Sequence, residues 1–133
     1  MTSASAGDQD LAQVHSPYEI TETISRLEEC FRSHGLTLFA RIDHGAEASK
    51  IGLTLHPARR LILGNPRPGT PFMIASPTIA IDLPSKALVW EDAGGNGLVT
   101  DNKPGYIQRR HSPPDRLVVT LCGITALVQK ALA

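Results

Sequence analysis

The segment from residue 16 to residue 44 constrains the fold most, because a helix pattern is followed at once by a strand pattern. The stretch Ser16-Pro17-Tyr18-Glu19 has the form of a capping box with Pro at the first helical position, and Gly35 supplies a left-handed stop. Four apolar residues between them recur at the spacing of one helix face, namely Ile20, Ile24, Leu27 and Phe31. The sequence therefore predicts a helix between Ser16 and Gly35.

The next segment, Thr37–His44, alternates in the way typical of a half-buried strand, with Leu38, Ala40 and Ile42 on one side. Further strands are predicted at Leu11–His15, Arg60–Gly64, Ala87–Glu91 and Leu98–Thr100, the last two joined as a hairpin. Helices are predicted at Ala46–Ile51, from Thr70 with a break at Pro77, at Pro104–His111 and after Asp115. Pattern alone does not separate a parallel α/β sheet from an α+β layer.

The length of 133 residues fits one domain, for which we expect residues 11–133, preceded by a disordered tail at residues 1–10. Thirteen basic and thirteen acidic residues cancel, which argues against nucleic-acid binding and against binding to a membrane surface. No segment has the length of a membrane span or the form of a secretory signal. With only two cysteines, both expected in the core, the sequence favours a cytoplasmic location.

Four pieces occur in order at close intervals: FARIDH (39–44), LGNPRPGTP (63–71), IDLP (81–84) and LVWED (88–92). Their order and spacing resemble the bacterial and archaeal family called domain of unknown function 302. The resemblance implies an α+β fold with a curved, mainly antiparallel sheet of about five strands and helices packed on one face. In outline this is similar to the TATA-binding-protein-like architecture, with no implication of DNA binding, because fold does not fix function.

Acid and histidine side chains stand at the ends of predicted elements, where scaffolds often place functional groups. These are Asp43 and His44 after a strand, Asp82 before Pro84, and His111 at the end of a helix. A metal site would need them to converge from distant segments, and no known metal motif is present, so we predict neither metal nor cofactor. In the alternative interpretation, Asp43 and His44 cap the helix that begins near Ala46.

The stretch Asn65–Pro71 follows a strand, precedes a helix and holds a cation, as a phosphate-binding loop would. Its three prolines delete the backbone donors that such a loop needs, so a rigid connector is the favoured interpretation. A small ligand or anion at Arg67 and at the helix start near Thr70 is the alternative.

We expect a non-enzymatic ligand-binding or interaction module that acts as a homodimer, because no complete catalytic constellation is visible. The helix after Asp115 carries a wide apolar arc, including Leu117, Leu121 and Leu127, that could serve the subunit contact. The alternative is a small-molecule enzyme or metal-dependent protein. Its site would be built from Asp43, His44, Asn65, Asp82 and His111.

Overall fold

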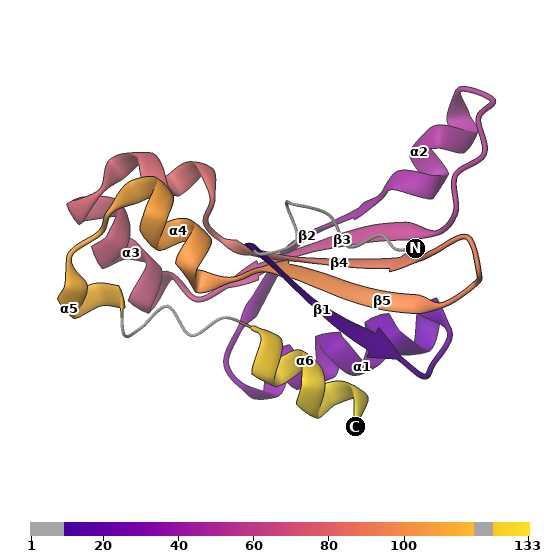
Figure 1. Ribbon diagram of the computed structural model, residues 1–133, viewed down its shortest axis with the longest axis horizontal. Helices are drawn as coiled ribbons and strands as arrows, with labels where there is room; N and C mark the ends of the chain where they lie inside the picture. Colours follow the sequence, from indigo (N-terminus) through magenta and orange to yellow (C-terminus); the bar gives the residue numbers. More distant parts are fainter. Residues whose placement is uncertain (1–9, 119–123) are drawn as a thin grey trace.

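The computed structural model describes residues 10–118 and 124–133, and its centre is a five-stranded sheet in the order β1-β5-β4-β3-β2 (Figure 1). All four strand pairings are antiparallel, which confirms the α+β class. The strands are β1 (Leu11–Ser16), β2 (Thr37–Asp43), β3 (Ala58–Gly64), β4 (Ser85–Glu91) and β5 (Gly97–Asn102). The predicted tail at residues 1–10 lies, apart from Asp10, outside the described residues.

Two helices, α1 (Ile20–Ser33) and α6 (Thr125–Leu132), cover one face of this sheet (Figure 1). Their apolar sides meet the inward-facing residues of the strands and form the main core. Its buried members are Leu27, Phe31, Leu61, Leu63, Ala87, Val89, Val99, Ile124, Val128 and Leu132. The prediction of helices on one face therefore holds for α1 and α6, while the remaining helices lie beyond the ends of the strands.

The predicted start of α1, with Ser16 as cap and Pro17 as first helical residue, is wrong by three residues. The helix begins at Ile20, and its cap position, Glu19, makes no side-chain capping bond. Ser16 instead ends β1, where its hydroxyl bonds to the hydroxyl of Thr23 at 2.6 Å and accepts from the Tyr18 amide at 3.2 Å. The predicted stop is right, because Gly35 has a φ of +79°, in the left-handed region.

The predicted alternation of β2 is also wrong, because a bulge shifts its register between Leu38 and Ala40. Leu38 pairs with Leu63 on the core face, whereas Ala40 pairs with Ile62 on the opposite face. A bulge inserts one extra residue, here at Phe39, so every later side chain on the strand changes face. Arg41 thereby points toward α1, where its guanidinium bonds to both carboxylate oxygens of Glu28 at 2.7 Å.

The helix α2 (His44–Lys50) and the following loop project from the end of the sheet, on the side away from α1 and α6 (Figure 1). We call residues 44–57 the arm. Gly52, with a φ of +79°, directly follows the predicted end of this helix at Ile51, and none of the residues of α2 is buried.

At the other end of the sheet, α3 (Pro66–Ala75), the short helix η2 (Pro77–Ile81), α4 (Pro104–His111) and α5 (Asp115–Val118) pack together (Figure 1). A second, smaller core of Phe72, Ile79 and Ile107 holds them. Of the helix predicted after Asp115, the structure describes α5, which ends at Val118, and α6 (Thr125–Leu132), whereas residues 119–123 lie outside the described residues. Ile124, Val128 and Leu132 face the main core of their own chain, and Leu121 lies outside the described residues.

Candidate functional site

The start of α3 lies four residues earlier than the predicted start at Thr70, because Asn65 is the cap. Its side-chain oxygen accepts from the Arg67 amide at 2.9 Å, and Pro66 occupies the first helical position, where a missing N–H costs nothing. Pro68 also lacks an N–H, and the Gly69 amide donates to the Asn65 carbonyl at 3.3 Å. The amides of this first turn are therefore absent or already used.

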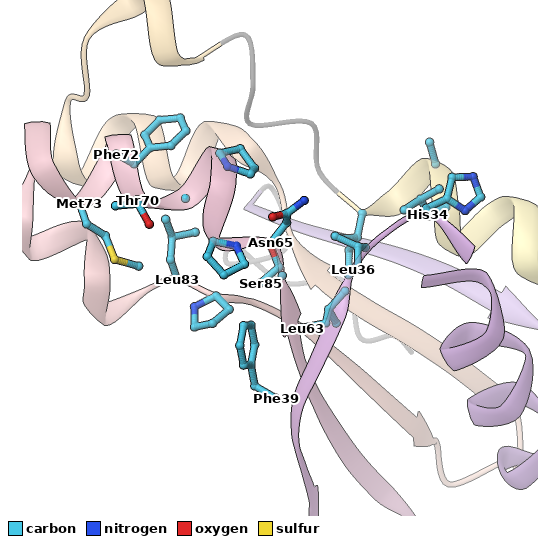
Figure 2. Close-up of a pocket in the computed structure, with 18 residues that line it drawn as sticks. His34, Leu36, Phe39, Leu63, Asn65, Thr70, Phe72, Met73, Leu83 and Ser85 are labelled. Atoms are coloured by element: carbon cyan, nitrogen blue, oxygen red, sulfur yellow. The ribbon is translucent and has the colours of Figure 1, made fainter. Parts of the chain in front are cut away.

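Behind this helix start lies a pocket of about 640 Å³, between the ends of β3 and β4, α3 and the first turn of α6 (Figure 2). Most of its wall is apolar, and Figure 2 shows Phe39, Leu63, Met73 and Leu83 around the same space. The apolar lining residues are Leu36, Phe39, Leu63, Pro66, Pro68, Phe72, Met73, Leu83, Pro84, Ile124, Ala126 and Leu127.

Few polar side chains of the described residues reach this pocket, and two of them are predicted site residues, Asn65 and Thr70. Ser85 at the start of β4 and His34 after α1 are the others. The cap bond occupies the side-chain oxygen of Asn65, which leaves the amide nitrogen as a donor at the pocket wall. Arg67, in contrast, is exposed and is not among the lining residues.

Asp82 and His111, predicted as site residues, come together between η2 and α4. The His111 Nε2 atom lies 2.5 Å from the Asp82 Oδ2 atom, and the two side chains are only 5% and 7% exposed. The His111 Nδ1 atom lies 3.1 Å from the Thr78 hydroxyl, and Arg110 Nη1 lies 3.5 Å from Asp82 Oδ1. With a neutral ring, Nε2–H donates to Asp82 and Nδ1 accepts from Thr78.

Asp43 and His44 lie at the opposite end of β3, at the base of the arm. The Asp43 carboxylate accepts from the Ala46 amide at 2.9 Å, as in the capping interpretation, and lies 3.3 Å from Arg59. The strand β3 thus separates Asp43 and His44 from the Asp82–His111 pair. Among the described residues, no three His, Cys, Asp or Glu side chains are grouped so that they could hold a metal ion.

Sequence patterns missed most of the pocket wall, since Phe39, Phe72 and Met73 look like ordinary core residues in sequence. Phe39 is missed because the bulge in β2 leaves it 49% exposed at the pocket wall, and no local pattern in the sequence marks that bulge. A second missed residue is Asp101, a buried carboxylate that accepts from the Thr125 hydroxyl at 3.1–3.2 Å. Burial raises the pKa of Asp101, and the bond from Thr125 offsets part of that rise. Its signal was a carboxylate at a core-facing position of a strand.

Comparison with known proteins gives a consistent assignment of the fold. The model of the family described as domain of unknown function DUF302 matches residues 12–129. A crystal structure of an uncharacterized conserved DUF302 protein from Bacillus stearothermophilus has a TM-score of 0.78 and 20% identity, over 92% of this chain and 94% of that chain. At this identity the likeness shows the fold alone.

Two curated relatives bear a functional name, Fluoride-specific ion channel FluC 1, and come from Brucella suis biovar 1 and Brucella abortus biovar 1. Each is 43% identical to this chain over 109 residues, which are 82% of the chain but 43% and 40% of those proteins. The chain therefore spans about two fifths of the length of the relatives it matches. Within residues 10–118 and 124–133, no helix has the length and apolar character to cross a membrane.

Proposed function

The chain belongs to the DUF302 family, and from that premise we propose that it is a non-enzymatic module that binds an uncharged, largely apolar small molecule and acts as a homodimer. The observation that carries the ligand part is the pocket of about 640 Å³, which falls within the range of roughly 300–1,000 Å³ usual for small-molecule sites.

The wall of the pocket supports this ligand class. Burial of apolar surface drives binding in such a pocket, and a few polar groups fix the orientation of the ligand. Among the described lining residues there is no Asp, Glu, Lys or Arg, so an ion entering this space would lose its hydration without a charged partner. The Asn65 amide and the hydroxyls of Thr70 and Ser85 suit a ligand that carries a single polar end, such as a carbonyl.

The test compares two fluorescent probes that share a ring system, N-phenylnaphthylamine, which is uncharged, and anilinonaphthalene sulfonate, which is an anion. We expect saturable fluorescence enhancement with the uncharged probe and weaker binding of the anion. Thr70 is exposed at the pocket wall, so Thr70→Trp narrows the pocket without replacing a core side chain. This variant should weaken binding of the uncharged probe at least tenfold.

The matched control is Ile74→Trp, which places the same side chain on the same helix at an exposed position that does not line the pocket. It should bind the uncharged probe as the unchanged chain does. Equal loss of binding in both tryptophan variants, or binding that does not saturate, would contradict the pocket as the site.

A second candidate role is suggested by the relatives named as fluoride-specific ion channels, which share 43% identity with this chain over 109 residues. In this role the ligand-binding module acts together with a fluoride channel and adjusts its activity. The check is fluoride tolerance of cells that carry the channel, compared between the unchanged chain and Thr70→Trp. No difference between the two would contradict a role of the pocket in fluoride handling.

A further inference from the structure

The face of the sheet opposite α1 and α6, together with the arm, presents apolar side chains that join neither core. On the sheet, strand register places one such set together on this outer face: Ala58, Ile62, Leu88, Trp90 and Leu98. These residues are partly exposed and belong to neither buried cluster of the described residues. We call this set the outer face.

The arm adds three large aliphatic side chains in alternating positions. Ile51, Leu53 and Leu55 are 73%, 60% and 49% exposed. None of the residues of α2 is buried, so contacts within the chain do little to stabilise the arm. The exposure of these aliphatic side chains to water is therefore not offset within the single chain. Figure 1 shows the arm rising from the sheet on the side away from α1 and α6, which is the side of the outer face.

We infer that a second copy of this chain docks on the outer face, with each arm closing over its partner in a two-fold symmetric dimer. This inference rests on the homodimer in the proposed function and names its surface. A projecting apolar arm and an uncovered apolar face on one molecule are mutually complementary, so a two-fold axis satisfies both at once. The proposed contact differs from the one predicted at the C-terminal helix, because Ile124, Val128 and Leu132 already pack in the main core of their own chain.

The area available agrees with a stable dimer. Five strands spaced roughly 4.8 Å apart, with lengths of about 20 Å, give a sheet face of roughly 400–500 Å² before its side-chain relief is counted. A stable interface buries about 800 Å² on each partner. The arm supplies the additional surface, which an isolated sheet of this size lacks.

Sedimentation velocity over a range of chain concentrations tests this surface with one variant and one matched control. Leu53→Glu places a charge on the arm, and Ile74→Glu places the same charge at a 77% exposed position on α3, outside the surface. Both positions are exposed in the single chain, so both variants should keep the circular dichroism of the unchanged protein. We expect Leu53→Glu to raise the dimer Kd roughly a hundredfold, since each dimer loses two aliphatic contacts, and Ile74→Glu to leave it unchanged.

Amine cross-linking of mixed isotope-labelled and unlabelled chains gives a direct readout. Lys50 lies on the arm and Lys86 lies on the outer face, in register with Ile62. Cross-links between Lys50 of one chain and Lys86 of another are expected, and their restriction to single chains would overturn the inference.

The outcomes separate this inference from the proposed function. A dimer that persists unchanged in Leu53→Glu overturns the docking surface and leaves the homodimer standing. A chain that remains monomeric at high micromolar concentration overturns both the surface and the homodimer, whereas binding of the uncharged probe in the pocket is measured independently of either.

Discussion

Two buried carboxylates, Asp82 and Asp101, have different kinds of partner. Asp82 lies against the imidazole of His111 and within 3.5 Å of Arg110, so cationic or ring N–H donors surround it. Among the described residues, Asp101 accepts from one hydroxyl, that of Thr125, and it lies on the core face of β5 beside Ala87. The contacts of Asp82 connect η2 with α4. The bond from Thr125 to Asp101, in contrast, offsets only part of the free-energy cost of removing the Asp101 carboxylate from water.

The Asp101→Asn substitution should change how stability depends on pH. Burial raises the pKa of Asp101 above its ordinary value of 3.8, so the folded chain holds this proton to higher pH than the unfolded chain does. The stability contributed by the protonated form is therefore complete below that ordinary value and is lost as pH rises through the raised pKa. The asparagine keeps an oxygen for the Thr125 hydroxyl and does not titrate, so this loss should disappear. Urea unfolding across acidic pH measures it, and identical profiles for both proteins would contradict the assignment.

The two predicted site histidines should respond differently to alanine substitution. His111→Ala leaves the buried Asp82 without its main partner and should lower the free energy of unfolding by about 1–3 kcal/mol. His44→Ala, in a helix with no buried residue, should change it by less than about 0.5 kcal/mol.

Thermal unfolding of both histidine variants, with binding of the uncharged probe as a second measurement, checks this contrast. An unchanged melting temperature in His111→Ala, together with lost ligand or metal uptake, would instead favour the enzyme or metal-dependent alternative.

At the scale of elements, the sequence pattern predicted whether each segment forms a helix or a strand, but the observed boundaries of several elements differ from the predicted ones. The prediction favoured a rigid connector at Asn65–Pro71, yet Asn65 caps α3 and the first two prolines lie inside its first turn. Proline is compatible with that turn because the amides there have no intrahelical acceptor. A proline-rich start of a helix and a rigid loop therefore look alike in sequence, and packing of Phe72 in the second core distinguishes them.

Substitution by alanine should change the free energy of unfolding in opposite directions at two glycines, one at the end of β3 and one within α3. Gly69 lies within α3 and an added Cβ would meet no atom within 4 Å, so Gly69→Ala should raise the free energy of unfolding by about 0.5–1 kcal/mol. Gly64 ends β3, where an added Cβ would lie 3.1 Å from the Cβ of Pro84. Gly64→Ala should therefore destabilise the chain.

Urea unfolding of the two alanine variants measures both signs in one experiment. A destabilised Gly69→Ala protein would mean that α3 does not include this position in solution. An unchanged Gly64→Ala protein would mean that Pro84 moves aside at no cost.

At the scale of the whole molecule, long-range pairing decides where the candidate sites lie. The first strand, β1, pairs with the last strand, β5. The residues that line the pocket likewise come from distant parts of the chain, namely the end of α1, β3, α3, the start of β4 and α6. The same topology places Asp43 and His44 near the start of β3, where Asp43 pairs with Arg59, and the Asp82–His111 pair near its end, where Leu63 pairs with Ser85. Of the seven predicted site residues, only Asn65 and Thr70 reach the pocket.

The sequence by itself determined the helices and strands, the left-handed stops at Gly35 and Gly52 and the hairpin between β4 and β5, because these depend on neighbours within a few residues. Tertiary structure alone decided the bulge at Phe39, the convergence of the pocket wall and the outer face, which none of the described helices covers. Each of these depends on contacts between segments far apart in the chain, whose geometry has no local pattern in the sequence.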